Sequence, residues 1–269
     1  MNQIEMSDDF RKMFEDLAKY GILRHDEDKP LYKYVSIDTA KKIIGNGTIK
    51  FSTPHELNDN DLDTSLLNPT VSEAEKIKIT QEIIKKHSDL HPELNQYIDP
   101  EYGAFKLQQI FTDLDFNLAT LQGYEAQKKS VGIFCSTTNK TNKYMWEKYA
   151  ESHTGVCLEF RFPTLFNKIF YTFTVTYDFE FNSGMLFNKD GSVNSLTINR
   201  WLFTKSKKYD IENEVRIITE NSIGICPFPK KLLTGVIYGR DISDKDVFEI
   251  DELLARGGYL FKQGERVEN

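Results

Sequence analysis

Two hydrophobic patterns alternate along the chain and predict its elements. Short apolar or alternating runs of the kind found in strands cover residues 31–35, 48–52, 131–136, 155–161, 169–179, 211–219 and 233–238, with a last short run at 259–262. Apolar residues three and four positions apart, as in helices, mark 8–20, 36–44, 142–152, 196–207 and 243–256. The stretch 72–127 is mostly helical in pattern. This mixture of elements, without repeats, predicts an α+β fold.

Capping residues support several of these helix boundaries. Ser36 precedes one helix, and the run Gly45-Asn46-Gly47 ends it. Ser243 begins the last long helix. We expect one α+β domain over residues 1–269 with a mixed, mostly antiparallel central sheet. Residues 68–129 would then be a helical insertion within that domain.

The stretch 209–218, Tyr-Asp-Ile-Glu-Asn-Glu-Val-Arg-Ile-Ile, combines a strand pattern with three charges. Because side chains on a strand alternate, Glu212, Glu214 and Arg216 should share one face. Ile211 and Val215, with Ile217, should lie on the other face, in the core. Two interpretations follow: a solvated sheet face on which Arg216 pairs with both carboxylates, or one wall of a catalytic cleft.

Composition and charge narrow the classes of partner. The 269 residues are 39% hydrophobic and 28% charged, which indicates a globular protein. Aromatic residues make up 13%, enough for a large aromatic core or for flat surfaces that meet a planar ligand. The net charge of −7 argues against broad, non-specific contact with nucleic-acid phosphates. Local basic patches remain, at Lys205 with Lys207 and Lys208, and at Lys230 with Lys231.

The cysteines and the first residues predict a cytoplasmic protein. Cys135, Cys157 and Cys226 are odd in number, far apart and set in apolar runs, so we expect them to be reduced and buried. The first nine residues lack the basic and apolar regions of a secretory signal. No run approaches the roughly 18 apolar residues of a membrane span, so no membrane contact is expected.

The familiar metal and phosphate motifs are missing from the sequence. The pair His87 and His91 is followed by a proline in a polar region, and no metal site is expected there. The chain has neither a Gly-rich dinucleotide loop nor a P-loop. The acidic loop 52–63, which contains Asn58 and Asp59, is either an ordinary turn or a loop that orients a substrate. The aromatic helix face of Trp146 and Tyr149 is either core or a ligand platform.

Four short motifs in a fixed order resemble one bacterial family. They are Leu31-Tyr-Lys-Tyr, Phe51-Ser-x-Pro-x-x-x-Asn-Asp59, Met145-Trp-x-x-Tyr149 with Gly155-Val-Cys-Leu-Glu159, and Glu212-x-Glu-x-Arg216. The order is similar to that of the bacterial domain-of-unknown-function 2971 family, from about residue 30 to about residue 240. Two departures stand out: the family pattern Asn-Asp-Pro-Phe-Glu/Asp is Asn58-Asp-Asn-Asp-Leu-Asp63 here, and the family's Trp before Glu-x-Glu is Tyr209. The roles of Asp61 and Asp63 therefore stay open.

The layout also resembles the ADP-ribosyltransferase fold, which implies a site that binds NAD. In those enzymes a Glu on one strand is catalytic. An Arg, His or Tyr on an early strand, together with a Ser or Thr on another strand, holds NAD in position. The resemblance implies Glu214 as catalytic residue, Glu212 as its partner, and Arg216 or Lys33 at the pyrophosphate. It further implies three kinds of NAD-binding residue. Tyr32 or Tyr34 would take the early-strand position, and Ser52 with Thr53, or the rival pair Ser136-Thr137, would supply the Ser-Thr element. Tyr34, Trp146 or Tyr149 would stack on the nicotinamide or adenine ring. The Arg or His of the early strand is missing.

The expected activity is transfer of ADP-ribose from NAD to a nucleic acid or protein. A carboxylate aimed at the ribose would stabilise the positive charge that develops as nicotinamide leaves, and a second would take the acceptor's proton. No metal is needed for this chemistry. The resemblance implies a bacterial toxin or phage-defence effector, with an antitoxin or defence-system partner.

Two other functions stay open at this point. If Glu214 contributes to ligand binding and not to chemistry, the chain would be a non-catalytic module that senses a nucleotide or binds a partner. It would be a Mg²⁺-dependent nuclease if Asp59, Asp61 and Asp63 joined Glu214 around a metal.

Overall fold

The computed structural model describes residues 29–54, 56–57, 131–163, 170–177, 202–220, 222–261 and 265–266, and the positions 8, 12, 22, 25 and 26. The chain divides into two units, and the first comprises Met1–Leu57, Ser130–Asp178 and Phe203–Asn269. All that follows concerns this first unit. The helical insertion expected at 68–129 lies outside the described residues, so the domain organisation stays a prediction. The expected helix at 8–20 is described only at Asp8 and Lys12, which are helical.

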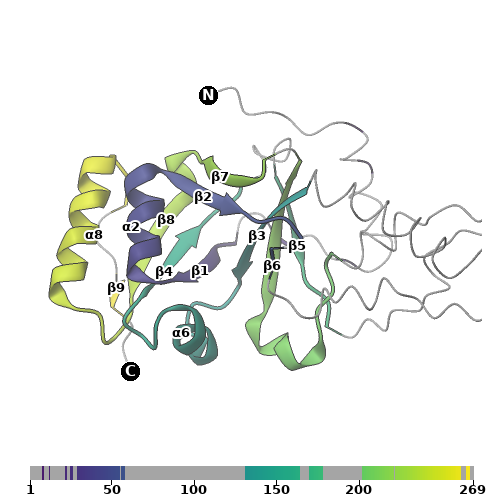
Figure 1. Cartoon of the computed structure of the whole chain (residues 1–269), viewed down its shortest axis with the longest axis horizontal. Coiled ribbons are helices and arrows are strands. Elements are labelled where there is room, and N and C mark those ends of the chain that lie inside the picture. The colour runs from purple at the N-terminus through teal and green to yellow at the C-terminus, as the bar shows by residue number, and fades with distance from the viewer. Residues whose placement is uncertain are drawn as a thin grey trace, which may run out of the picture. The chain divides into compact units, whose positions relative to one another are not determined.

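A seven-stranded sheet forms the centre of the unit (Figure 1). Its strands run in the order β5-β6-β3-β1-β4-β8-β9, and every pairing is antiparallel except that of β8 with β9. The strands are β1 (Leu31–Val35), β3 (Val131–Thr137), β4 (Val156–Phe160), β5 (Tyr171–Thr174), β6 (Glu214–Glu220), β8 (Leu233–Tyr238) and β9 (Glu265–Arg266). β2 (Thr48–Phe51) pairs with β7 (Gly224–Pro227) in a separate ribbon. The predicted α+β class with a mostly antiparallel mixed sheet is confirmed.

Two helices cover one face of this sheet, α2 (Ile37–Asn46) and α8 (Asp244–Gly257) (Figure 1). Ser36 caps α2 by accepting a hydrogen bond from the Thr39 N–H at 3.2 Å, as its place before the helix predicts. Gly47 ends α2 with φ of 62°, a left-handed conformation that glycine adopts without a steric cost. Lys41 joins the two helices through Asp246, with its Nζ 2.8 Å from Oδ1.

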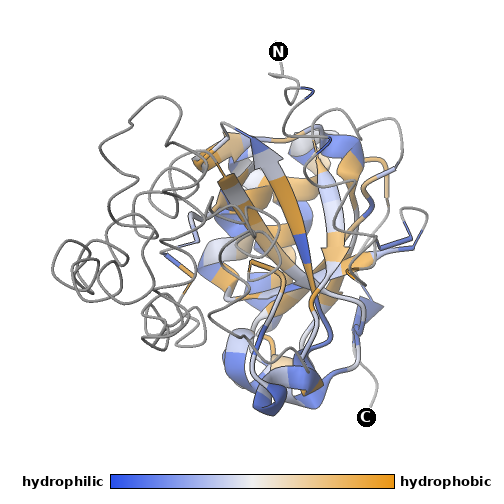
Figure 2. Cartoon of the chain, turned by 90° about the vertical axis from the view of Figure 1, so that its right-hand side faces the viewer, coloured by the Kyte–Doolittle hydropathy of each residue, from blue (hydrophilic) through white to orange (hydrophobic). Residues whose placement is uncertain are grey.

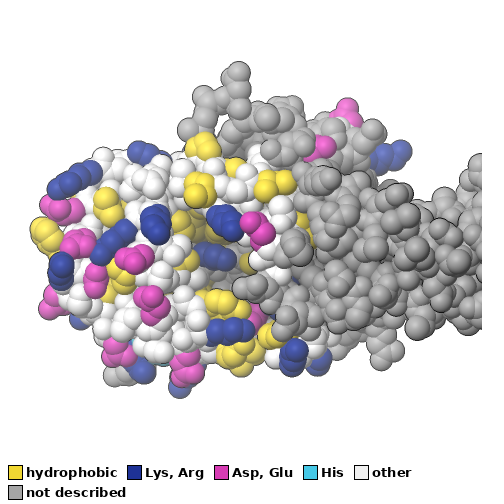
Figure 3. Space-filling view, viewed as in Figure 1, with side chains coloured by type: hydrophobic (Ala, Val, Ile, Leu, Met, Phe, Trp, Pro, Cys, Tyr) yellow, Lys and Arg dark blue, Asp and Glu magenta, His cyan; other side chains and the backbone are white. Residues whose placement is uncertain are grey.

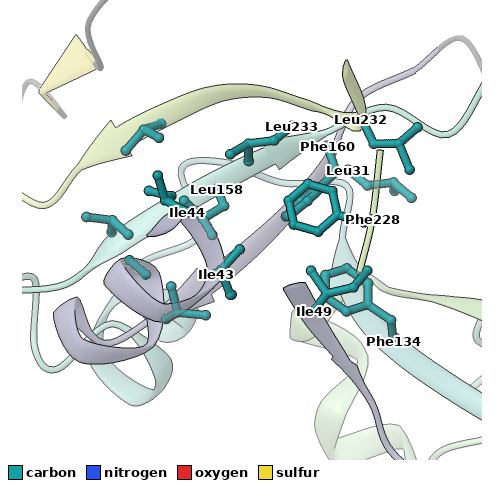
Figure 4. Packing of buried hydrophobic residues seen from close by; sticks show 14 of the residues in the cluster. Leu31, Ile43, Ile44, Ile49, Phe134, Leu158, Phe160, Phe228, Leu232 and Leu233 are labelled. Atoms are coloured by element: carbon teal, nitrogen blue, oxygen red, sulfur yellow. The ribbon is translucent and has the colours of Figure 1, made fainter. Parts of the chain in front are cut away.

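The hydrophobic core lies between these helices and the sheet, and it is rich in aromatic rings. Figure 4 shows its side chains pointing toward one another from the helix and from the strands: Leu31, Ile43, Ile44, Ile49, Phe134, Leu158, Phe160, Phe228, Leu232 and Leu233. Full burial of each such side chain stabilises the fold by about 1.5–3 kcal/mol. Figure 2 shows hydrophobic residues along the strands and hydrophilic residues toward the outer loops.

The opposite face of the sheet is covered by the short helix α6 (Lys143–Tyr149). Trp146 of α6 packs edge-on against Tyr34 of β1, with 5.0 Å between ring centroids. Directly paired residues of antiparallel strands point to the same face. The pairs Tyr32–Thr137 and Thr137–Glu214 therefore place a tyrosine, a threonine and a glutamate on the α6 face of β1, β3 and β6. We call these three residues the Tyr–Thr–Glu row.

Several predicted boundaries are wrong, and each has a local cause. The strand expected from residue 211 begins at Glu214, because residues 207–212 form the 3₁₀ helix η6 (Lys207–Glu212). The helix expected at 196–207 is absent from residues 202–206, of which 202–203 form a turn and Thr204 forms a bridge with Thr176. Residues 259–261 are not a strand, and β7 was not predicted.

Candidate functional site: a buried charge network below α6

Four buried charged side chains form a hydrogen-bonded network on the α6 face. Lys205 donates to Glu212 Oε2 at 2.6 Å and to Glu214 Oε2 at 3.0 Å. Arg216 Nε donates to Glu214 Oε1 at 2.7 Å. Each of these residues is at most 5% exposed. Two carboxylates and two cations thus meet out of contact with water, where an unpaired charge would be costly.

The backbone at Asn213 brings the two glutamates together. Glu212 ends η6, Glu214 begins β6, and Asn213 between them has φ of 47°, in the left-handed region that asparagine tolerates better than most residues. Strand alternation was the wrong reason for expecting these carboxylates on one side. It also misplaced Ile211, which is 49% exposed rather than in the core.

The predicted solvated face is wrong, because the network is buried. Arg216 is fully buried and holds Glu214, whereas Lys205, not Arg216, bridges both carboxylates. Burial alone would raise the pKa of Glu214, but the charges of Arg216 and Lys205 lower it from 4.5 to about 2. Glu214 is therefore a carboxylate at neutral pH, and it is suited to stabilise positive charge rather than to donate a proton.

Two tyrosines complete the contacts of the carboxylates. Tyr149 at the end of α6 donates to Glu212 Oε1 at 3.0 Å, and Tyr177 accepts from the backbone N–H of Glu214 at 2.7 Å. Burial, and then the charge of Glu212, raises the pKa of Tyr149 to about 12, so its hydroxyl stays protonated and able to donate. Lys148 lies at the rim, with its Nζ 3.5 Å from Glu212 Oε1. Glu212 is thus the carboxylate nearest to the exposed side chains of α6.

The Tyr–Thr–Glu row shares Glu214 with this network and extends from it across β3 to β1. Neighbouring strands are about 4.8 Å apart, so the backbones of Tyr32 and Glu214 are separated by about 10 Å, with Thr137 between them. Burial, followed by the charge of Glu159, raises the pKa of Tyr32 to about 12. The row is buried: Tyr32 is 7% exposed, Thr137 0% and Glu214 5%.

Two of the proposed stacking residues belong to the core. Trp146 is 1% exposed and donates its indole N–H to the Lys140 carbonyl at 3.2 Å, so the core interpretation of this residue is right. Tyr34 is 3% exposed and donates to the Asn139 carbonyl at 2.8 Å. Tyr149 is 37% exposed, and of these three rings it is the one that a ligand can reach in this structure.

Other predicted binding residues lie away from the network. Lys33 points to the core face, where it donates to the Cys135 carbonyl at 2.7 Å and lies over the Phe134 ring. Ser52 bridges to Ile133, four residues from the row along β3, a distance of about 13 Å. Thr53 follows Ser52 and accepts from the Glu56 N–H. Asn58 and Asp59, with Asp61 and Asp63, lie outside the described residues.

Sequence reasoning missed Lys205 as a member of the site. It was noted only as part of a basic patch, because nothing local shows that it turns inward beneath the two glutamates. Tyr177, Lys148 and Tyr209 were likewise not assigned to the site. Thr137 was named as part of the rival pair Ser136-Thr137, and it lies opposite Glu214, whereas Ser136 donates to the Val215 carbonyl at 2.9 Å.

The described residues contain no group of three or more His, Cys, Asp or Glu side chains arranged to hold a metal ion. Within the same residues, no helix has the length and apolar character needed to cross a membrane. The three cysteines form no disulfide; Cys157 is buried, and Cys135 and Cys226 are half-buried rather than fully buried.

The charge network falls within a segment that is recognisable in other proteins. Residues 145–217 match the DUF2971 family, which is described as a family of unknown function. The predicted resemblance to DUF2971 is confirmed over this segment, about a quarter of the chain. The DUF2971 segment contains Tyr149, Lys205, Glu212, Glu214 and Arg216, whereas Tyr32 and Thr137 lie before it. No curated protein and no solved structure matches the chain. The resemblance to ADP-ribosyltransferases stays a prediction.

Proposed function

We propose that this protein is an ADP-ribosyltransferase-like enzyme that binds NAD along the Tyr–Thr–Glu row. The observation that carries the proposal is the alignment of a tyrosine, a threonine and a glutamate at one level of three adjacent strands. These are the residue types, on separate strands, that the resemblance implies for holding NAD. An ionised Glu214 in a site that excludes water is suited to stabilise a ribosyl cation.

The proposed reaction breaks the bond between the ribose C1′ and the nicotinamide nitrogen. The bonding electrons leave with nicotinamide, which becomes neutral, and positive charge develops on the ribose. Glu214 stabilises that charge and accepts a hydrogen bond from a ribose hydroxyl. The acceptor then forms its bond to C1′ and gives up a proton, for which Glu212 is the nearest carboxylate to the exposed Tyr149.

NAD binding in this proposal requires the buried Tyr–Thr–Glu row to open and the charge network to rearrange. Both oxygens of Glu214 already accept hydrogen bonds from cations, so a ribose hydroxyl must replace one of them. Lys205 is the better candidate to move, because it retains Glu212 as a partner at 2.6 Å. Arg216 would remain on Glu214 and keep its carboxylate ionised.

The test follows both halves of NAD. The protein is incubated with NAD labelled in the adenine or the nicotinamide part, together with cell extract, RNA and DNA. We expect nicotinamide release and transfer of the adenine label, and a loss of at least 100-fold in Glu214→Gln. Glu220→Gln is the matched control, since Glu220 lies at the far end of β6 and should leave activity unchanged.

Folding of Glu214→Gln is checked by circular dichroism and thermal melting. Because one acid would then face two buried cations, the double variant Glu214→Gln with Lys205→Met restores the charge balance if the single variant is unstable. Absence of both nicotinamide release and label transfer under all conditions would sink the proposal.

A non-catalytic nucleotide-binding module is the second candidate. It is favoured by the occupation of both Glu214 oxygens by buried cations, because Lys205 also binds Glu212 and so joins η6 to β6 without any catalytic role. That function predicts a thermal shift with NAD or another nucleotide and no turnover, and Glu214→Gln would change affinity alone. The Mg²⁺-dependent nuclease fits less well, because the Glu214 oxygens already face cations; EDTA-sensitive cleavage would revive it.

A further inference from the structure

Three tyrosine rings and a lysine form an exposed cluster above the charge network. The Lys148 ammonium lies 5.0 Å from the Tyr144 ring centroid, 5.1 Å from that of Tyr149 and 5.2 Å from that of Tyr209. Lys148 also donates to the Tyr144 hydroxyl at 2.7 Å. We call these four residues the tyrosine–lysine surface. In Figure 3, hydrophobic and basic side chains lie next to each other over α6 and η6, where this surface is found.

Three ammonium groups lie against the Tyr209 ring, and Glu212 and Glu214 offset the charge of one of them, the buried Lys205. Besides Lys148, the ammonium groups of Lys205 and Lys208 lie 4.8 Å and 4.7 Å from the Tyr209 centroid. Such contacts hold each cation against the ring. Burial alone would lower the pKa of Lys148, but hydrogen bonds with Tyr144 and Tyr149 and the charge of Glu212 raise it above its ordinary value. Lys148 is therefore charged at any physiological pH.

The surface remains open to solvent. The Lys148 side chain is 42% exposed and Tyr149 is 37% exposed, while Tyr144 and Tyr209 are half-buried. Flat rings with fixed positive charges beside them suit a ligand that has both planar groups and negative charges. A cationic ligand is disfavoured, because lysine ammonium groups already lie against the rings.

We propose that the tyrosine–lysine surface binds single-stranded nucleic acid. Its bases would stack on Tyr149 and Tyr209 in place of the Lys148 and Lys208 ammonium groups, which would move from the rings to the phosphates. Sites for single strands combine aromatic platforms with positive charge in this way. A protein partner fits less well, because lysine is depleted at protein interfaces. A duplex fits less well too, because its bases stack on one another and the protein as a whole carries a charge of −7.

The position of the surface connects it with the charge network. Tyr149 donates to Glu212, and Lys205 binds both glutamates while lying under Tyr209. A nucleotide stacked on these rings is thus one side chain away from Glu212. This step rests on the proposed function: the bound strand would be the acceptor of ADP-ribose, with Glu212 placed to take its proton.

Binding is tested without NAD. Fluorescence anisotropy measures the affinity of the full chain for labelled single-stranded DNA, single-stranded RNA and duplex DNA of about 12 nucleotides, at about 50 mM salt. We expect a single strand to bind at least ten-fold more tightly than the duplex. Lys148→Met and Tyr209→Leu should each weaken single-strand binding at least ten-fold.

A similar pair elsewhere in the chain supplies the control. Lys230 lies over the Tyr259 ring at 5.7 Å, so Lys230→Met removes the same kind of contact away from the surface and should leave affinity unchanged. Thermal melting shows whether each variant folds. Equal binding of duplex and single strand, or unchanged affinity in both Lys148→Met and Tyr209→Leu, would overturn the inference.

The outcome separates this inference from the proposed function. Strand binding without any nicotinamide release refutes the enzyme and leaves the binding surface standing. Nicotinamide release by a protein that binds no strand refutes the surface alone.

Discussion

At the scale of single residues, Glu214 makes its own contribution to the loss of stability in acid. Its pKa is lowered from 4.5 to about 2, so the folded state holds this proton less tightly than the unfolded chain does. The resulting stabilisation is complete above about pH 5 and is lost as the pH falls toward 2. From these pKa values the loss at pH 3, relative to neutral pH, is about 2 kcal/mol.

We therefore expect the unfolding free energy of the native protein to fall more steeply with acid than that of Glu214→Gln. Urea unfolding at several pH values between 7 and about 3 gives both curves, and their difference removes the contribution of carboxylates common to both, such as Asp246. Parallel curves would show that Glu214 is not held by its cations in solution. The double variant with Lys205→Met serves if the single variant is too unstable to measure.

The residues of this network show how far sequence could predict the site. The sequence singled out the motif Glu-x-Glu-x-Arg and foresaw the pairing of Arg216 with Glu214. The reason was wrong, because the left-handed Asn213, not strand alternation, brings Glu212 into place. Lys205 could not be predicted: its contact with Glu212 depends on the fold of residues 202–206, which the helical pattern at 196–207 misrepresented.

At the scale of elements, Asn142 connects three parts of the α6 face. Its Oδ1 accepts from the Met145 N–H at 3.3 Å and caps α6, its Nδ2 donates to the Ile211 carbonyl of η6 at 2.5 Å, and its N–H donates to Tyr34 at 3.2 Å. Asn142 is 6% exposed. The side chain thus fixes the helix that carries Tyr149 to the segment that carries Glu212.

Loss of this side chain should cost more than loss of a simple cap. We expect Asn142→Ala to lower the unfolding free energy by about 1.5–2.5 kcal/mol, from one cap, worth about 1 kcal/mol, and one hydrogen bond to the Ile211 carbonyl, worth about 0.5–1.5 kcal/mol, because that carbonyl keeps Asn213 Nδ2 as a donor. Ser243→Ala removes the exposed cap of α8 together with the bond from the Ser243 hydroxyl to Asp246 Oδ2, and it should cost about 1 kcal/mol. Equal losses in the two variants, measured by urea unfolding, would contradict a connecting role for Asn142.

The positions of helices and strands along the chain were predicted better than the pairing of the strands. Caps and apolar periodicity placed β1, α2, β3, β8 and α8 close to where they lie, because these signals are local. The same signals could not show that β2 pairs with β7 rather than joining the main sheet, since that pairing spans about 175 residues of chain. The end of α6 was also missed: residues 151–153 all have positive φ, although none of them is glycine.

At the scale of the whole molecule, charge is distributed unevenly. The chain carries −7 overall, yet the tyrosine–lysine surface has several lysines around one ring. Net charge alone argued against broad contact with nucleic-acid phosphates. It limits how much charge can contribute to binding a strand, but it does not exclude such binding. A strand held by few lysines on an acidic protein must rely on stacking for most of its affinity.

That division between charge and stacking can be measured through salt. Each phosphate neutralised on a single strand lowers the slope of log affinity against log salt by about 0.7, so contacts from Lys148 and Lys208 predict a slope of about −1.4. Lys148→Met should reduce its magnitude by about 0.7. Tyr209→Leu should weaken binding at every salt concentration and leave the slope unchanged, because stacking releases no counterions. A slope of −4 or steeper would mean that a wider basic surface holds the strand, and unchanged slopes in both variants would remove Lys148 from the contact.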